Sequence, residues 1–371
     1  MNYLYKSLFT FILICYCARS AQGQGTSWTN RLYIESDFHY GFVTPHHMFI
    51  TYFINDHVQG YQLNIGLHTN GEKKWHQYYN YPNIGLGFYH SGLGNNQVFG
   101  HTNALFYYVE RFFFCQNKKL NFGNRISFGM SYNTKKYDIK NDNFNMAIGS
   151  KLNVFLSYCI EGMYRISPFL SLKLGVGFTH TSNGNFREPN KGLNLITAFT
   201  GLQYSFSDPA KTQTITSKGE DENGKNQFLI TTALGRKQTD IITKQMVTPL
   251  ALSVEYSRKI SRTSWVGISI NQYYDPSLKQ KIESSGDTAA LGDNVRISLN
   301  LSYELKMGRL SYVFQPGIYL KNNYLMDGVI SNRLGFRYQL NSHLLACVTI
   351  KAHWLAIADF IECGIGYQWQ K

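Results

Sequence analysis

Short segments in which apolar and polar residues alternate one by one recur along this chain, and they limit its fold more than any other feature. Residues 120–132, 295–305 and 361–369 each place apolar side chains at every second position, with few exceptions, and mostly polar side chains or glycines between them. Successive side chains of a β-strand point to opposite faces, so each segment predicts a strand with one apolar and one polar face. The polar face of residues 295–305 carries two charges, Arg296 and Glu304.

The composition favours strands that cross a membrane. Beyond the N-terminus, no stretch offers the ~20 consecutive apolar residues of a transmembrane helix. Aromatic residues nevertheless make up 15% of the chain, and it contains 32 glycines. A membrane barrel alternates lipid-facing and lumen-facing residues, which accounts for both facts. We therefore predict an all-β fold, a transmembrane antiparallel outer-membrane β-barrel of roughly 12 to 16 strands.

The N-terminus predicts export. Lys6 precedes a short apolar core at residues 8–17, and small residues follow up to Gly23. This order is typical of a secretory signal peptide, so we assign residues 1–23 to the signal peptide and residues 24–371 to a single outer-membrane barrel domain. The polar stretches 207–227 and 275–293 are interpreted as loops outside the membrane rather than as domain linkers. The runner-up fold is a soluble β-sandwich or secreted barrel, whose strands would need polar outer faces.

Charge and cysteine content limit the partners. The formal net charge is +13, and it falls to about +11 when the signal peptide is removed. For an exported chain this basic balance favours outer-membrane lipids and lipopolysaccharide over nucleic acid. The remaining cysteines lie far apart without CxxC spacing, which argues against a zinc site. Eight of the eleven histidines fall between His39 and His101, but none has the spacing of a helical metal motif, so we expect no metal and no cofactor.

A candidate catalytic pair ends the segment that begins at Leu172. The alternation puts His180 and Ser182 on the apolar, lipid-facing side of one strand. A base and a nucleophile two residues apart on one strand face are close enough for the imidazole to contact the hydroxyl. A nucleophile on that face can meet a lipid ester without the lipid leaving the membrane. An isolated His-x-Ser is common by chance, and the pair alone would be read as ordinary interfacial residues.

The surrounding residues strengthen the catalytic interpretation. The sequence His180-Thr-Ser182-Asn183-Gly184, followed by Pro189-Asn-Lys-Gly192-Leu, resembles the signature of the lipid A 3-O-deacylase (PagL) and bacterial acyloxyacyl hydrolase family. The motif covers about 35 residues. The resemblance implies an outer-membrane barrel esterase in which Ser182 is the nucleophile and His180 the general base. Asn183 and Gly184 would then stabilise the oxyanion.

The chain departs from the family at the third catalytic position. The family has a glutamate twelve residues after the serine, and this chain has Asn194 there. Asn194 shares its predicted face with His180, so an amide oxygen could orient the imidazole but could not stabilise the imidazolium by charge. The sequence leaves three alternatives open: Asn194 is a weaker orienting residue, Glu188 or Asp359 replaces it, or the enzyme is slow or inactive.

The sequence thus predicts a serine esterase that hydrolyses an ester-linked acyl chain of lipid A. The alternative is a non-catalytic outer-membrane barrel, a pore or structural protein, that retains the motif. An eight-stranded deacylase would need only about half of this chain. The extra length therefore favours neither function, and the sequence does not indicate the oligomeric state.

Overall fold

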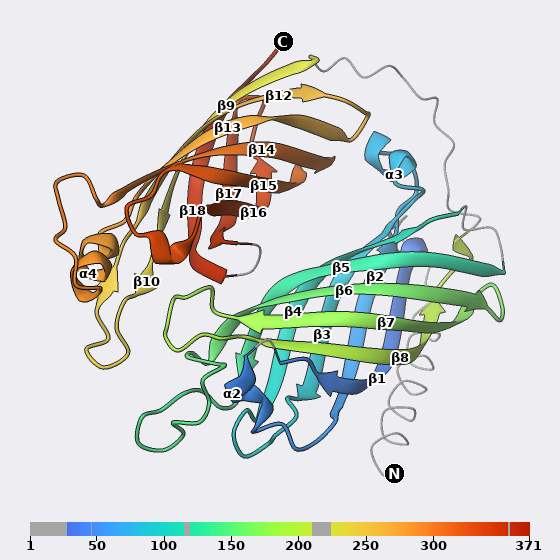
Figure 1. The fold of residues 1–371 in the computed structure, drawn as a ribbon. Helices are drawn as coiled ribbons and strands as arrows, with labels where there is room; N and C mark the ends of the chain where they lie inside the picture. The colour runs from blue at the N-terminus through green and yellow to red at the C-terminus, as the bar shows by residue number, and fades with distance from the viewer. Residues whose placement is uncertain (1–27, 46, 115–118, 210–223, 355–356) are drawn as a thin grey trace. The chain divides into compact units, whose positions relative to one another are not determined.

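The computed structural model describes residues 28–45, 47–114, 119–209, 224–354 and 357–371, and most of them form antiparallel β-strands (Figure 1). Within these ranges, none of the helices is both long enough and apolar enough to cross a membrane. The predicted signal peptide lies outside the described residues.

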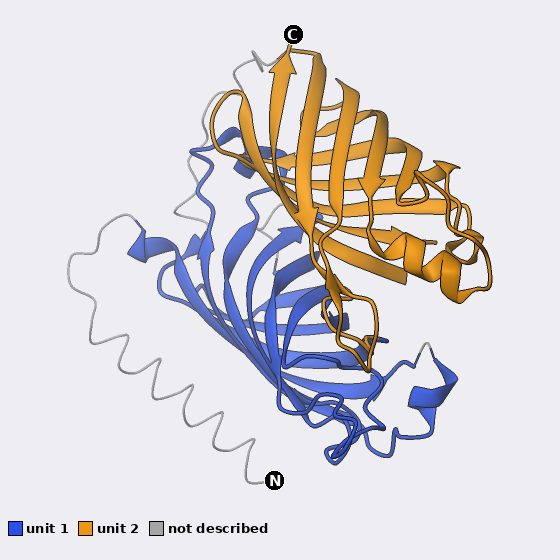
Figure 2. Cartoon of the chain, turned by 90° about the vertical axis from the view of Figure 1, so that its left-hand side faces the viewer, with its two compact units in different colours: residues 1–183, 191–217 blue, residues 184–190, 218–371 orange. Residues whose placement is uncertain are grey.

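The chain divides into two compact units (Figure 2). The first unit comprises residues 1–183 and 191–217, and the second comprises residues 184–190 and 218–371. Each unit contains one closed barrel of eight strands.

The first barrel closes because its last strand pairs with its first: β8 pairs with β1 from Leu195 opposite Val43 to Ser205 opposite Tyr33. The eight strands follow one another in chain order around the barrel. Its strands are Leu32–Val43 (β1), Val58–His68 (β2), Asn83–Gly92 (β3), His101–Phe112 (β4), Leu120–Asn133 (β5), Leu152–Arg165 (β6), Leu170–Ser182 (β7) and Leu193–Ser205 (β8). Its short helices are Thr29–Arg31 (η1), Met48–Thr51 (α2) and Lys74–Tyr78 (α3).

The second barrel is built in the same way, and its last strand β18 pairs with its first strand β9. Its strands are Asn226–Gly235 (β9), Leu250–Lys259 (β12), Ser264–Tyr274 (β13), Val295–Met307 (β14), Leu310–Lys321 (β15), Ile330–Gln339 (β16), Leu344–His353 (β17) and Ile357–Gln370 (β18). The loops between them carry the two-stranded sheet of Lys237–Gln238 (β10) and Met246–Val247 (β11), and the helices Ser277–Ser284 (α4) and Leu325–Asp327 (η3).

These barrels differ from the predicted single barrel of 12 to 16 strands. The sequence alternation was sufficient to predict antiparallel strands, but β8 pairs with β1 and not with the next strand in the chain, β9. The polar stretch 207–227, predicted as a loop within one barrel, connects the two barrels instead, and its residues 210–223 lie outside the described part.

The predicted faces of the strands agree with the structure. In β5 and β14 most of the polar residues point into the barrel and are buried, whereas most of the apolar residues lie on the outer wall. The interior of the first barrel holds paired charges, including Arg125 with Glu161 at 2.9 Å and Lys173 with Glu35 at 2.9 Å. An eight-stranded barrel leaves an interior just wide enough for side chains to fill. Buried charges need such partners, because an unpaired charge away from water is costly.

Candidate active site

His180 and Ser182 lie at the end of β7, on the outer wall of the first barrel. Phe178, Val176 and Leu174 continue the same face of the strand and are exposed. The imidazole Nε2 of His180 lies 2.8 Å from the Ser182 hydroxyl oxygen, within hydrogen-bond distance. The side chain of Ser182 is nearly covered, with the residue only 7% exposed. The two-residue spacing thus brings the base against the hydroxyl, as the period of a strand requires.

Asn194 lies directly across from His180, because the two residues are register partners in the β7–β8 pair. Its side-chain oxygen is 2.6 Å from the imidazole Nδ1 of His180. An amide oxygen only accepts hydrogen bonds, so this contact calls for a proton on Nδ1 and makes Nε2 the acceptor for the Ser182 hydroxyl. The three residues therefore form one hydrogen-bonded series in which His180 has the tautomer that a general base needs.

Asn183 and Gly184, the two residues predicted to stabilise an oxyanion, follow Ser182 directly. Asn183 is 4% exposed. Gly184 has a φ of +59°, a left-handed conformation that glycine adopts without steric cost. Their assignment to an oxyanion hole stays a prediction.

Gly192 is a further residue of this site, although the motif that contains it did not indicate a role for it. A Cβ atom at this position would lie 3.0 Å from Cε1 of His180 and 3.3 Å from Cβ of Ser182. Its φ of +70° is also left-handed. The Gly192 N–H donates to the Ala147 carbonyl at 2.9 Å, which ties the start of β8 to the loop 134–151. The glycine in the motif was the available signal, but its contact with the histidine depends on the fold.

Asp359 and Glu188 are the two acids that were considered in place of Asn194 at the third catalytic position. Asp359 was predicted on the apolar face of the last strand, and this placement is wrong. The β17–β18 register shifts beside Lys351, so the side chain of Asp359 is turned into the second barrel. There its carboxylate accepts from the ammonium groups of Lys237 and Lys351. Glu188 belongs to the segment 184–190 of the second unit, and its role stays a prediction.

The outer wall changes from apolar to polar at the height of Ser182. The register partner of Ser182 on β6 is Val154, and Met130 and Leu105 continue that row across β5 and β4. Two residues further toward the end of the barrel, the outward row contains Tyr132, Asn103 and His90. Nδ1 of His90 lies 2.8 Å from the side-chain oxygen of Asn103, within hydrogen-bond distance. Ser182 therefore lies at the boundary between an apolar wall and a polar rim.

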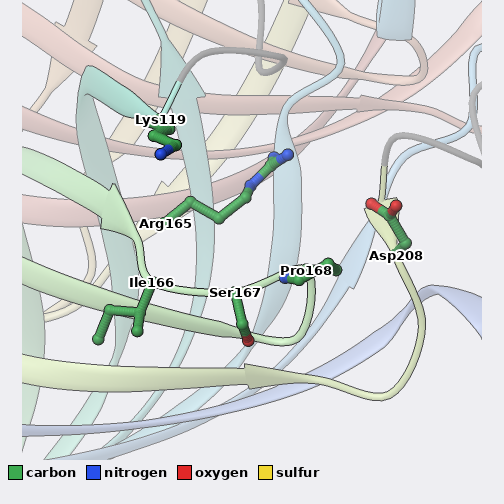
Figure 3. A pocket seen from close by; sticks show the side chains of 6 residues that line it. All are labelled: Lys119, Arg165, Ile166, Ser167, Pro168 and Asp208. Atoms are coloured by element: carbon green, nitrogen blue, oxygen red, sulfur yellow. The ribbon is translucent and has the colours of Figure 1, made fainter.

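A pocket of about 190 Å³ lies elsewhere in the first unit (Figure 3). Its lining is Lys119, Arg165, Ile166, Ser167, Pro168 and Asp208. Arg165 ends β6, whereas Val154, the partner of Ser182, lies near the start of the same strand. The intervening residues span more than about 30 Å at the rise of a β-strand, so this pocket is no part of the candidate active site.

Where the structure describes the histidine-rich part of the chain, the side chains form no metal centre. Among the residues that the structure describes, no group of three or more His, Cys, Asp or Glu side chains is placed to hold a metal ion. His90 and His101 stack on each other with ring centroids 5.5 Å apart, and His46 lies outside the described residues.

Comparison with known proteins matches a different family model to each barrel. Residues 59–203 match the family described as lipid A 3-O-deacylase (PagL), and residues 226–371 match the acyloxyacyl hydrolase C-terminal domain. No curated protein matches the chain. Among solved structures, the chain is similar to Neisserial surface protein A (10% identity, TM-score 0.32, 47% of this chain and 97% of that chain). It is also similar to the outer membrane enzyme PagL (14% identity, TM-score 0.31, 45% of this chain and 97% of that chain).

Proposed function

The chain belongs to the family of lipid A deacylases (PagL) and acyloxyacyl hydrolases, and we propose that its first barrel is an outer-membrane serine esterase that removes an ester-linked acyl chain from lipid A. The observation that carries this proposal is the series Ser182, His180, Asn194, with contacts of 2.8 and 2.6 Å on the outer wall. The second barrel is matched by the other domain of the family, and it contributes none of these three residues.

In the proposed reaction the Ser182 oxygen attacks the ester carbonyl carbon, and Nε2 of His180 takes the hydroxyl proton. The negative charge on the carbonyl oxygen is stabilised by donors at Asn183 and Gly184. The tetrahedral intermediate collapses, the imidazolium gives its proton to the departing sugar oxygen, and the acyl chain stays on Ser182. A water molecule, deprotonated by His180, then hydrolyses the acyl-serine to release a fatty acid.

The position of Ser182 between an apolar wall and a polar rim supports a membrane lipid as the substrate. An ester linkage of lipid A joins a polar sugar to an apolar chain, so it lies at the interface between headgroups and hydrocarbon. The part of the outer wall formed by Val154, Met130 and Leu105 would contact acyl chains. The polar rim formed by Tyr132 and Asn103 would contact the sugar. The substrate could then reach the serine without leaving the membrane.

The alternative, a pore, is disfavoured by the barrel interiors. In the first barrel, Arg125 and Lys173 are fully buried against acidic partners. In the second barrel, Arg337 pairs with Glu255 at 2.6 Å and both side chains are buried. Side chains that fill an eight-stranded barrel leave little room for a water column.

The direct test is mass spectrometry of lipid A from cells of a Gram-negative host that express the full chain. We expect a lipid A species that has lost the mass of one ester-linked acyl chain and that is absent from cells carrying the empty vector. An unchanged lipid A profile, with the protein folded in the outer membrane, would contradict the proposal.

A second prediction concerns Gly192. Gly192→Ala forces a side chain into a left-handed backbone position and places its Cβ against His180 and Ser182. We expect kcat to fall by about tenfold or more, because a small displacement of catalytic groups has a large effect on rate. Gly286→Ala is the matched control, since Gly286 also has positive φ but a Cβ atom there would meet open space within 4 Å. Equal loss of activity in both variants would show that backbone strain alone is responsible.

A further inference from the structure

We propose that Lys151 forms a phosphate subsite, which binds a phosphate monoester on the sugar headgroup of the substrate. The inference rests on the proposed function, since it assigns the part of the substrate next to the ester that Ser182 attacks. Three observations support it. They are the position of Lys151 next to β6, the direction of its side chain, and the different contacts of Lys135 and Lys140 in the same loop.

Lys151 directly precedes β6, and β6 pairs with β7, the strand that carries His180 and Ser182. Val154, three residues further on, is the register partner of Ser182. Three residues of a strand span about 10 Å, and neighbouring strands are about 5 Å apart. The Lys151 backbone is therefore about one sugar ring and one lysine side chain away from the Ser182 hydroxyl, on the side of the polar rim.

The side chain of Lys151 is directed over the outer wall. Its ammonium nitrogen lies 5.7 Å from the ring centroid of Tyr132, which projects outward from β5 and is 44% exposed. A cation over an aromatic ring is stabilised by the ring while it keeps part of its hydration shell. Lys173 of the same barrel points instead into the interior, where acidic side chains surround it. Lys151 thus supplies a positive charge on the outside of the barrel, at the height of a lipid headgroup.

The loop before β6 contains other lysines, but they are placed differently. The ammonium group of Lys135 donates to the carbonyl of Gln97, so this side chain is directed at a neighbouring loop. Lys140 is exposed within the loop, where its own N–H donates to the Asp138 carboxylate at 3.0 Å. The structure places neither of them against the outward ring of Tyr132. Lys140 therefore serves as a control that removes one charge from the same loop.

Phosphate groups occur on the sugars of lipid A and, as diesters, in glycerophospholipids. The sugar phosphate fits better, because the ester and the phosphate are then held on one rigid ring framework. An ammonium group binds a doubly charged monoester more strongly than a singly charged diester. The ligand of Lys151 is therefore the sugar phosphate monoester, and a phospholipid serves as the comparison lipid in the test.

The test measures equilibrium binding in the full-length Ser182→Ala protein, in which no substrate is consumed. The protein in detergent micelles is titrated with three lipids: lipid A carrying its phosphates, the same lipid A after enzymatic removal of the phosphates, and phosphatidylglycerol. Lys151→Gln is compared with Lys140→Gln in that background. We expect Lys151→Gln to weaken the binding of phosphorylated lipid A by about tenfold, and to leave the other two lipids unchanged. We expect Lys140→Gln to change none of them by more than about twofold.

Three results would overturn the proposal: equal weakening for phosphorylated and dephosphorylated lipid A, weakening for phosphatidylglycerol alone, or equal effects of the two lysine variants. Acyl release by the protein that retains Ser182 is measured in parallel on phosphorylated lipid A. Absence of acyl release with a selective effect of Lys151→Gln on binding would reject the proposed esterase but keep the phosphate subsite. Acyl release without a selective effect of Lys151→Gln on binding would support the esterase and reject the phosphate subsite.

Discussion

Ser182→Ala should abolish the release of acyl chains from lipid A. The variant removes the only atom that attacks the ester in the proposed reaction, and loss of the serine in serine hydrolases lowers kcat by roughly 10⁴-fold or more. The measurement is fatty acid release from purified lipid A by the full chain in detergent, together with mass spectrometry of lipid A from expressing cells. Folding should be unaffected, because the change deletes one oxygen atom at a residue on the outer wall.

Thr200→Ala is the matched control for this variant. Thr200 lies on β8, on the same outward face as Asn194, and the variant likewise removes a hydroxyl from the outer wall. We expect it to keep the activity of the parent chain. If Ser182→Ala released acyl chains as fast as Thr200→Ala, the nucleophile would have to be another group, and the contacts between His180 and Ser182 would be structural only.

The sequence predicted much of the candidate site because the site depends on strand periodicity. His180 and Ser182 share a face through their two-residue spacing, and that face is the outer wall. Asn194 was predicted on the same side across the hairpin, and its register with His180 is what the structure adds. The contact of 2.6 Å follows from that register, because directly opposed residues of an antiparallel pair have neighbouring side chains.

The remaining features depend on pairing between distant segments, which alternation does not encode. Most strands of both barrels have the same two-faced pattern, so the pattern cannot tell whether β8 pairs with β9 or returns to β1. A register irregularity turns Asp359 inward although the period predicts an outward side chain. Gly192 was visible in the motif, but only the folded chain shows that a Cβ atom at this position would lie 3.0 Å from Cε1 of His180.

Asn194→Asp and Asn194→Glu should raise the rate of acyl release. In the proposed reaction His180 becomes an imidazolium, and a carboxylate 2.6 Å from Nδ1 would stabilise that positive charge, which an amide oxygen cannot do. Asp has the shape of Asn, so it places the charge without changing the geometry, and Glu restores the residue type of the family. The opposite change in a serine protease lowers kcat by about 10⁴-fold, which sets an upper limit for the gain. We expect an increase of about 10- to 100-fold in kcat.

The series Ala, Asn, Asp and Glu at position 194 separates orientation from charge. If Asn194 orients the ring, Asn194→Ala should lower kcat below that of the parent chain, because His180 then loses the acceptor that selects its tautomer. If position 194 only orients the ring, kcat should be equal for Asn and Asp and lower for Ala. If charge also contributes, kcat should be higher for Asp than for Asn. If kcat were the same in all four proteins, Asn194 would not be the third catalytic residue. In that case we expect Glu188→Gln, which removes the charge of the alternative acid nearest in the sequence, to lower kcat. If Glu188→Gln also had no effect, the catalytic group would be a dyad of Ser182 and His180.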